Sequence, residues 1–224
     1  MLVPPLSWSQ EEVPALLDHV LLGCNNLDHG IAFVEERTGV RAAFGGVHPG
    51  RGTRNALLSL GERRYLEIIA PDPKQSDIQL WAVPQLTLLK ELTTPRLIGW
   101  AAHPGELDVV AKRLRESGIA FQGPRPGSRS RPDGRVLSWK SLNLADDRHG
   151  LLPFFIEWDA NSLHPSADAP AGCHLERFAV VGPDPAELSQ TFQRLGITVV
   201  IERGEKPQLR ARITGPGGKF EVSS

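Results

Sequence analysis

The sequence predicts an α+β protein built from repeated β-α-β-β-β units (βαβββ modules). Three helix-like stretches each end in a glycine followed by a β-branched residue, at Gly39-Val40, Gly118-Ile119 and Gly196-Ile197. The glycines lie 79 and 78 residues apart (39 to 118 and 118 to 196), and regular spacing of this kind is typical of an internally repeated fold. Each helix-like stretch follows one short apolar run and precedes further strand-like runs, which gives the repeated order.

The first unit opens with a short apolar strand and a helix. Asn26 suits the N-cap of that helix, where a side-chain oxygen accepts from a free backbone N–H. Leu27, Ile31 and Val34 then recur at helical spacing, which predicts one buried helix face. Gly39 suits the left-handed residue that ends a helix. The predicted strands are 17–22, 40–47, 55–60 and 64–70.

The second unit repeats this order. Pro104 suits the first turn of its helix, and Leu107, Val110 and Leu114 form an apolar stripe. The predicted strands are 97–102, 119–122, 136–143 and 152–158. Between the second and third of these strands we expect a loop over 123–134, and long loops tend to be functional or disordered.

The third unit is shorter. Asp184 and Glu187 resemble a capping box, with Pro185 at the first helical position. The segment between the first two units predicts a short helix near 86–92, and 159–172 reads as a linker. The chain therefore divides into a domain of paired modules at 15–160 and an additional short βαβββ module at 172–224. We expect that module to bury its sheet either against the first two units or against a second subunit of a homodimer.

The composition excludes several function classes. The chain has 224 residues, of which 40% are hydrophobic and 23% charged, which is typical of a globular protein. Its net charge of −1 gives no electrostatic reason to expect nucleic acid or membrane as a partner. No run approaches the ~20 apolar residues of a membrane span, and no signal peptide is evident. Cys24 and Cys173 form no disulfide framework, so we expect a cytoplasmic protein.

Three candidate metal ligands lie in apolar strands. Because alternate residues of a strand share a face, His19 is expected to point the same way as Leu17 and Leu21. Glu67 and Glu157 hold equivalent places in two units, and a buried carboxylate is costly unless it is paired or binds a cation. The pattern predicts that all three aim into one cleft, as ligands for zinc, iron, nickel or manganese. The alternative is a core histidine and a Glu67 paired with a nearby arginine.

Two further segments supply candidates for substrate binding. The run 45–55 is rich in glycine but lacks the Lys-Ser/Thr of a phosphate-binding P-loop. Its backbone can approach a ligand closely, and His48, Thr53 and Asn55 would add polar contacts, although a simple hairpin turn is the alternative. Arg129, in the long arginine-rich loop, could clamp a carboxylate or phosphate, unless that loop is only solvated.

Five stretches together carry a family resemblance. They are Leu17-Asp-His-Val20, His48-Pro-Gly-Arg-Gly-Thr53 with Asn55, Tyr65-Leu-Glu-Ile-Ile-Ala-Pro-Asp-Pro73, Pro126-Gly-Ser-Arg-Ser-Arg-Pro-Asp-Gly134 with Trp139, and Phe155-Ile-Glu-Trp-Asp159. They cover about 15–160 and resemble the glyoxalase-like domain group of the vicinal oxygen chelate superfamily. That superfamily includes glyoxalases, extradiol dioxygenases, epimerases and antibiotic-resistance proteins.

The resemblance implies two modules that curve around a common cleft, where a divalent metal chelates two neighbouring substrate oxygens. Carried onto this chain, the ligands would be His19, Glu67 and Glu157, with Glu157 acting either as third ligand or as general base. The fourth ligand normally comes from the first strand of the second module. Ile98 and Gly99 stand at the corresponding positions, and neither is a ligand, so either water completes the shell or no metal binds.

Two functions from different classes remain open at this point. The first is a metal-dependent enzyme of lyase or isomerase type that acts on a small oxygen-rich substrate, with Arg129 anchoring a substrate anion. The second is a non-catalytic protein that binds or sequesters a small molecule in the same cleft without metal. The missing fourth ligand favours the second function, and the paired glutamates favour the first.

Overall fold

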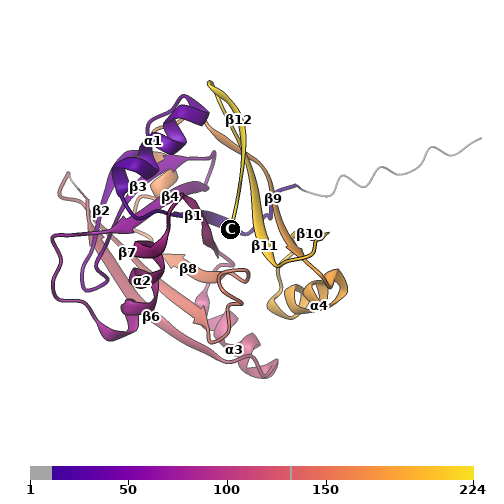
Figure 1. The fold of residues 1–224 in the computed structure, drawn as a ribbon. Coiled ribbons are helices and arrows are strands. Elements are labelled where there is room, and N and C mark those ends of the chain that lie inside the picture. Colours follow the sequence, from indigo (N-terminus) through magenta and orange to yellow (C-terminus); the bar gives the residue numbers. More distant parts are fainter. Residues whose placement is uncertain (1–11, 132) are drawn as a thin grey trace, which may run out of the picture.

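The computed structural model describes residues 12–131 and 133–224, and its elements follow the expected order of three units (Figure 1). The first unit comprises β1 (Leu17–Gly23), α1 (Leu27–Thr38), β2 (Ala43–His48), β3 (Thr53–Ser59) and β4 (Tyr65–Pro71). A connection with η1 (Leu80–Ala82) and α2 (Val83–Glu91) follows. The second unit comprises β5 (Arg96–Ala102), α3 (Leu107–Glu116), β6 (Phe121–Ser130), β7 (Val136–Leu144) and β8 (Phe154–Trp158). After η2 (Pro165–Ala167), the third comprises β9 (His174–Gly182), α4 (Pro185–Leu195), β10 (Val200–Arg203), β11 (Gln208–Gly215) and β12 (Gly218–Ser223).

The ends of α1 and α4 confirm the local predictions, whereas α3 begins at Leu107, so Pro104 lies before its first turn. The Asn26 side chain accepts from the backbone N–H of His29 at 3.1 Å, and Asp184 caps α4 in the same way. Gly39 and Gly196 both have φ of 73°, a left-handed conformation that costs glycine little. Among the described residues no helix is long and apolar enough to cross a membrane.

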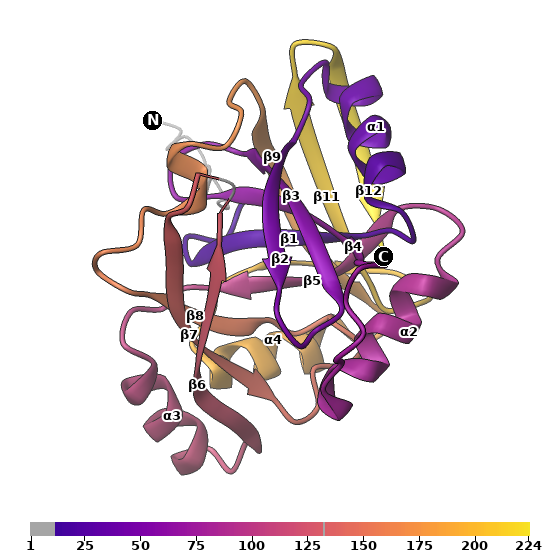
Figure 2. The ribbon, with the colours of Figure 1, turned by 90° about the vertical axis from the view of Figure 1, so that its left-hand side faces the viewer.

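The first two units form one sheet of eight strands in the order β2-β3-β4-β1-β5-β8-β7-β6. The first strand of each unit pairs in parallel with its last strand, and β1 pairs antiparallel with β5 at the centre. From the central β1–β5 pair outward, both units therefore place their strands in the same order: first, last, third and second strand of the unit. The sheet curls strongly, so the edge strands β2 and β6 come together (Figure 2). The predicted α+β class with repeated βαβββ modules is confirmed.

One predicted loop is a strand. Residues 121–130 form β6, which pairs with β7 from Phe121 to Ser130 around a register shift between Gln122 and Arg125. The prolines of this segment argue against a strand when the sequence is taken alone. Proline is nevertheless tolerated where a strand lies at a sheet edge or at a bulge. The arginine-rich segment is therefore a structured part of the curled sheet, and only its tip turns.

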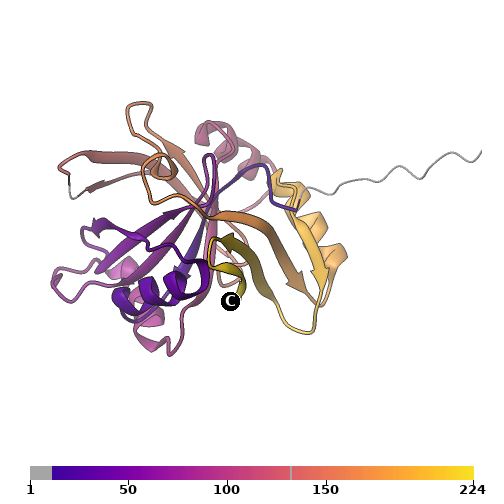
Figure 3. The same cartoon turned by 90° about the horizontal axis from the view of Figure 1, so that it is seen from above.

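The third unit has the same element order but a different strand order, β10-β9-β11-β12, in which β9 pairs in parallel with β10. Its elements contact β5, α1 and α3. The third unit lies on the side of the molecule away from the edge strands β2 and β6 (Figure 3). Phe178 and Phe192 pack against Trp100 of β5, with ring centroids 5.0 and 6.3 Å apart. One continuous hydrophobic core therefore joins the third unit to the first two.

Candidate functional site

A β-bulge at the start of β1 sets the direction of the candidate histidine. Leu17 pairs with Ala102 and His19 pairs with Ala101, so Asp18 is the extra residue between two successive partners. Bulges re-aim side chains and are common next to active sites. Leu17 consequently lies in the main hydrophobic core, and the expectation that it shares a face with His19 is wrong.

Asp18 is a fully buried carboxylate that accepts three hydrogen bonds. The donors are His19 Nδ1 at 2.7 Å, Trp158 Nε1 at 3.1 Å and His164 Nε2 at 3.2 Å. Burial alone would raise the pKa of Asp18, but the hydrogen bonds from His164 and His19 hold it well below its usual range. The ionised carboxylate holds a proton on His19 Nδ1, so in the neutral ring Nε2 is the nitrogen that carries the lone pair.

Glu67 lies on the far side of the His19 ring. Its Oε2 is 3.6 Å from His19 Nε2, which is beyond hydrogen-bond distance. Its Oε1 accepts from Asn55 Nδ2 at 2.6 Å and lies 3.5 Å from His48 Nε2. Burial alone would raise the pKa of Glu67, but His48, His19 and the Asn55 hydrogen bond lower it. Two acceptor atoms, His19 Nε2 and Glu67 Oε2, therefore face one small volume.

His48, Thr53 and Asn55 complete what we call the polar cluster, together with His19 and Glu67. His48 Nδ1 is hydrogen-bonded to the Thr53 hydroxyl at 2.9 Å, and His48 Nε2 accepts from Asn55 Nδ2 at 3.3 Å. Burial lowers the pKa of His48 to about 4, so its ring is neutral at pH 7. Thr53 and Asn55 thus hold His48, and Asn55 also holds Glu67, which brings all three residues predicted from the glycine-rich run into the cluster.

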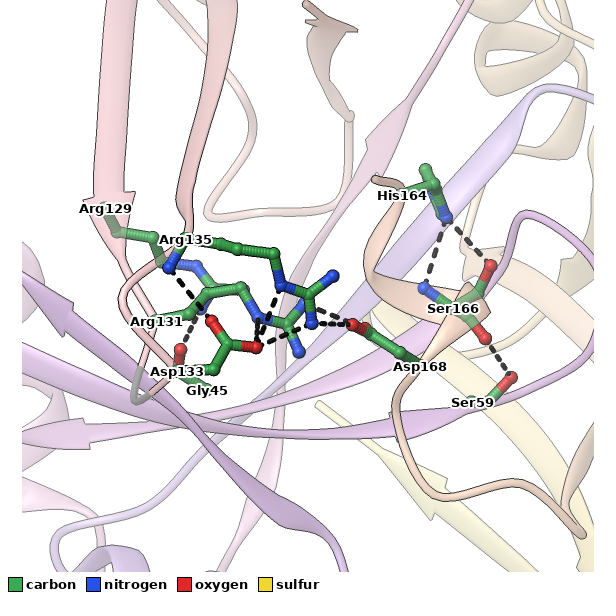
Figure 4. Close-up of polar contacts among 9 residues, drawn as sticks. All are labelled: Gly45, Ser59, Arg129, Arg131, Asp133, Arg135, His164, Ser166 and Asp168. Carbon is green, nitrogen blue, oxygen red and sulfur yellow. Dashed lines mark hydrogen bonds and ion pairs between the residues drawn. The ribbon is translucent and has the colours of Figure 1, made fainter. Parts of the chain in front are cut away.

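Arg129 closes the curled sheet next to the polar cluster. It is 4% exposed, and its Nη1 donates to the backbone oxygen of Gly45 on the opposite edge strand (Figure 4). Burial lowers its pKa, whereas the nearby Tyr65 and Glu67 raise it. The arginine therefore joins β6 to β2 and places a positive charge beside the cluster.

We expect Gly46→Ala to disrupt this closure. Gly46 has φ of +142°, and a Cβ there would lie 2.6 Å from the Ser130 backbone oxygen. The added clash and backbone strain should lower the free energy of unfolding by about 1–3 kcal/mol. Gly105→Ala is the matched control in urea denaturation, because Gly105 also has positive φ but a Cβ there would meet nothing within 4 Å. Equal losses in the two variants would mean that contact between the strand edges contributes nothing.

The structure corrects the expected position of Glu157. Phe154 of β8 faces His19, with ring centroids 5.5 Å apart, whereas Phe155 lies in the core with the apolar face of α3. Alternation places Glu157 on the side of Phe155. There its Oε2 accepts from the backbone N–H of Leu107 at 2.7 Å and its Oε1 lies 3.5 Å from Lys140. Glu157 therefore caps the start of α3 and does not join His19 and Glu67.

The second unit contributes apolar groups beside His19. Ala101 is the strand partner of His19, and the rings of Phe154 and His19 meet in an edge-on arrangement. Ile98 packs with Ile69, and the fourth-ligand position stays without a ligand. Within 12–131 and 133–224, no group of three His, Cys, Asp or Glu side chains is placed to hold a metal ion. His48 does not add a third, because both of its ring nitrogens are engaged by Thr53 and Asn55.

Two side chains of the polar cluster are of the kinds that bind the divalent metal that the resemblance implies. The His19 imidazole and the Glu67 carboxylate are ordinary ligands for such an ion, and their facing atoms are 3.6 Å apart. Asp18 behind His19 has the position of the carboxylate that commonly orients a metal-binding histidine. His19 and Glu67 therefore supply two donors of the kinds that such an ion takes.

Sequence reasoning missed Asp18 and His164 as members of this arrangement. Asp18 was visible as a charged residue inside an apolar strand, which is a signal for a buried partner. His164 lies in the linker 159–172, more than a hundred residues away in the chain, and only the fold brings it to Asp18. No local pattern in the sequence marks it.

The comparisons with known proteins concern the fold and the family. A family model described as "Glyoxalase-like domain" matches residues 17–209, and no curated protein sequence matches the chain. A hypothetical protein from Staphylococcus aureus has a similar structure, with a TM-score of 0.65 and 15% identity over 93% of this chain and 87% of that one. At this low sequence identity, the structural similarity supports a shared fold alone.

Two epimerase structures superpose less well, with lower TM-scores. A variant of Streptomyces coelicolor methylmalonyl-CoA epimerase, solved with 2-nitronate-propionyl-CoA, is 20% identical with a TM-score of 0.45, over 67% of this chain and 99% of that one. Methylmalonyl-CoA epimerase from Mycobacterium tuberculosis is 19% identical with a TM-score of 0.43, over 70% of this chain and 91% of that one.

Proposed function

Because the chain belongs to the glyoxalase-like domain family, we propose that it is an enzyme of isomerase or lyase type that acts on a small oxygen-rich substrate. The observation that carries the proposal is the facing pair of His19 Nε2 and Glu67 Oε2, 3.6 Å apart. Both belong to buried residues on one side of the curled sheet. Two fixed acceptors at this distance suit a shared cation or a substrate proton between them.

We propose that His19 and Glu67 hold a divalent ion, with zinc, nickel, manganese and iron as candidates. When bound, such an ion polarises substrate oxygens and stabilises negative charge that develops on them. Asp18 fixes the ring of His19 so that Nε2 faces Glu67. Two protein ligands leave room for two neighbouring oxygens of a substrate, which is consistent with the chelation typical of the superfamily.

The other members of the polar cluster would bind and orient the substrate. Asn55 holds one oxygen of Glu67, and the lowered pKa keeps that carboxylate ionised and able to bind a cation. Neutral His48 lies 3.5 Å from the same carboxylate and Thr53 holds the His48 ring, so both would shape the polar side of the substrate site. Arg129 would stabilise an anionic group of the substrate. Because His19 is only 2% exposed, the substrate has to be small or the sheet edges have to part.

A second candidate function is a non-catalytic binder that uses the same cluster without metal. The observation that favours it is the apolar contribution of the second unit, where Ala101 and Phe154 lie beside His19. A site with two protein ligands holds an ion less tightly than one with three or four. The metal content of the purified protein separates the two functions.

We expect the purified protein, supplemented with Zn²⁺, Ni²⁺, Mn²⁺ or Fe²⁺ and then desalted, to retain one equivalent of one of these metals by mass spectrometry. The double variant His19→Ala, Glu67→Ala should retain less than about a tenth of that amount, because both ligands are gone. Glu157→Gln is the matched control, since this carboxylate lies outside the cluster. Substoichiometric metal in the wild type would favour the binder, and equal retention in the double variant would place the metal elsewhere.

A further inference from the structure

We propose that His164 of the linker 159–172 is a positioning residue for the site, acting on His19 through Asp18. The inference rests on the proposed function, because it takes His19 as the central residue. His164 is 8% exposed, and its Nε2 donates to Asp18 Oδ2 at 3.2 Å. The other oxygen of the same carboxylate accepts from His19 Nδ1 at 2.7 Å. One carboxylate thus links a linker histidine to the site histidine.

The hydrogen bonds of His164 fix its tautomer as well as its place. The Ser166 backbone N–H donates to His164 Nδ1 at 3.2 Å, and the Ser166 hydroxyl lies 2.8 Å from the same nitrogen (Figure 4). Because Nδ1 accepts, the ring proton stays on Nε2 and points at Asp18. The Tyr65 ring packs against His164 and also stacks on His19. These contacts leave His164 one geometry, in which it holds Asp18 Oδ2 in place.

The hydrogen bonds to one oxygen of Asp18 set the direction of the other oxygen. A carboxylate that is bonded at Oδ2 by His164 and Trp158 has its plane fixed, and Oδ1 then aims at His19 Nδ1. That bond sets the direction of His19 Nε2 toward Glu67. Without the His164 donor, Asp18 keeps only Trp158 on Oδ2, so the plane of the carboxylate and the direction of His19 Nε2 are set less firmly.

The linker itself is anchored on both units of the curled sheet. On the second unit, Arg131 and Arg135 each lie 2.8 Å from the Asp168 carboxylate. On the first unit, the Ser59 hydroxyl donates to the Ser166 backbone oxygen at 3.0 Å (Figure 4). These anchors keep His164 at Asp18 but do not themselves contact Asp18 or His19. They therefore allow the effect of a looser linker to be separated from the effect of losing the His164 donor.

The experiment compares His164→Leu, His164→Gln and Asp168→Asn by NMR of the full chain. The His19 Nδ1 proton, bonded to Asp18 and 2% exposed, should give a low-field signal that His19→Gln identifies by its loss. We expect His164→Leu to shift or broaden this signal and His164→Gln, whose amide N–H can reach Asp18, to keep it. Asp168→Asn should loosen the linker and leave the signal in place. An unchanged signal in His164→Leu, or equal changes in the Leu and Gln variants, would overturn the proposal.

A second measurement uses Co²⁺ alone as the probe, through its visible absorption. We expect His164→Leu to weaken Co²⁺ binding at least about tenfold, as losses behind a metal-binding histidine typically do, and His164→Gln to stay within about threefold of the wild type. If the wild type binds no Co²⁺, the metal-dependent function fails, but the NMR result still decides the role of His164. If the wild type binds Co²⁺ and His164→Leu binds it equally well, the positioning role fails and the proposed function stands.

Discussion

Trp100→Ala is expected to lower the free energy of unfolding by about 3–5 kcal/mol, the range found for deletion of a large buried aromatic side chain. Trp100 is completely buried at the joint between the curled sheet and the third unit. Its ring contacts Phe178 and Phe192, and its Nε1 donates to the Leu151 backbone oxygen at 3.1 Å. The substitution removes packing and also leaves a buried carbonyl without its donor.

The same variant tests whether the third unit folds together with the first two. Because all three units share one hydrophobic core, urea unfolding of the wild type should show a single transition by fluorescence and by circular dichroism. Trp100→Ala should move that transition without splitting it. A separate early transition in the variant would mean that the third unit is held only by this contact.

Two controls isolate the cause of the loss. Trp81→Ala removes an indole that is 56% exposed, so it should cost less than about 1 kcal/mol. Trp100→Phe keeps most of the aromatic packing and removes the hydrogen bond, so its cost should lie between those of the two alanine variants. A loss below about 1 kcal/mol in Trp100→Ala would contradict the packing described for this joint.

The repeated fold could be predicted because its signals are local. A cap such as Asn26 and a left-handed glycine such as Gly39 act within one helical turn, so each can be recognised from a few neighbouring residues. The family resemblance, carried by motifs spread over the first two units, is confirmed by the family model. Alternation also placed Glu67 on a face of β4 that lies inside the curl, where Asn55 and His48 meet it.

The parts of the site that were missed depend on the fold as a whole. Phe155 and Glu157 were correctly assigned to one face of β8, but the sequence does not say which face lies inside the curl, because both faces of this sheet carry apolar residues. The bulge at Asp18 depends on the register between β1 and β5, which are far apart in sequence. His164 reaches Asp18 only because the linker crosses between the two units.

His48 should make the protein lose stability as the pH falls from about 6.5 to about 4. Burial lowers the pKa of His48 to about 4, an effect that the neighbouring Glu67 partly offsets and that Arg51 and Arg129 add to. In the unfolded chain a histidine titrates near 6.5. Since the folded-state pKa is the lower one, the stabilising contribution is present above the unfolded value and is lost as protons bind the unfolded chain first.

The size and the pH window of this effect follow from the same two pKa values. A difference of about two and a half units corresponds to roughly 3 kcal/mol, which makes it comparable with the loss of a core aromatic. Asp18 and Glu67 act in the same direction but at lower pH, because their lowered pKa values stabilise the folded chain above the usual range for carboxyl groups. His103, whose pKa burial also lowers, acts in the same direction over this range, so the part of the decrease that belongs to His48 is the part that a His48 variant removes.

The measurement is the free energy of unfolding in urea from pH 7 to pH 4 for the wild type, His48→Asn and His29→Asn. His48→Asn loses hydrogen bonds and should be less stable at pH 7, but its stability should change less between pH 6.5 and 4.5 than that of the wild type. His29 is exposed, so its variant should keep the wild-type slope. Parallel curves for the wild type and His48→Asn would show that His48 is not held neutral in the folded protein, because only a lowered folded-state pKa links this side chain to the slope.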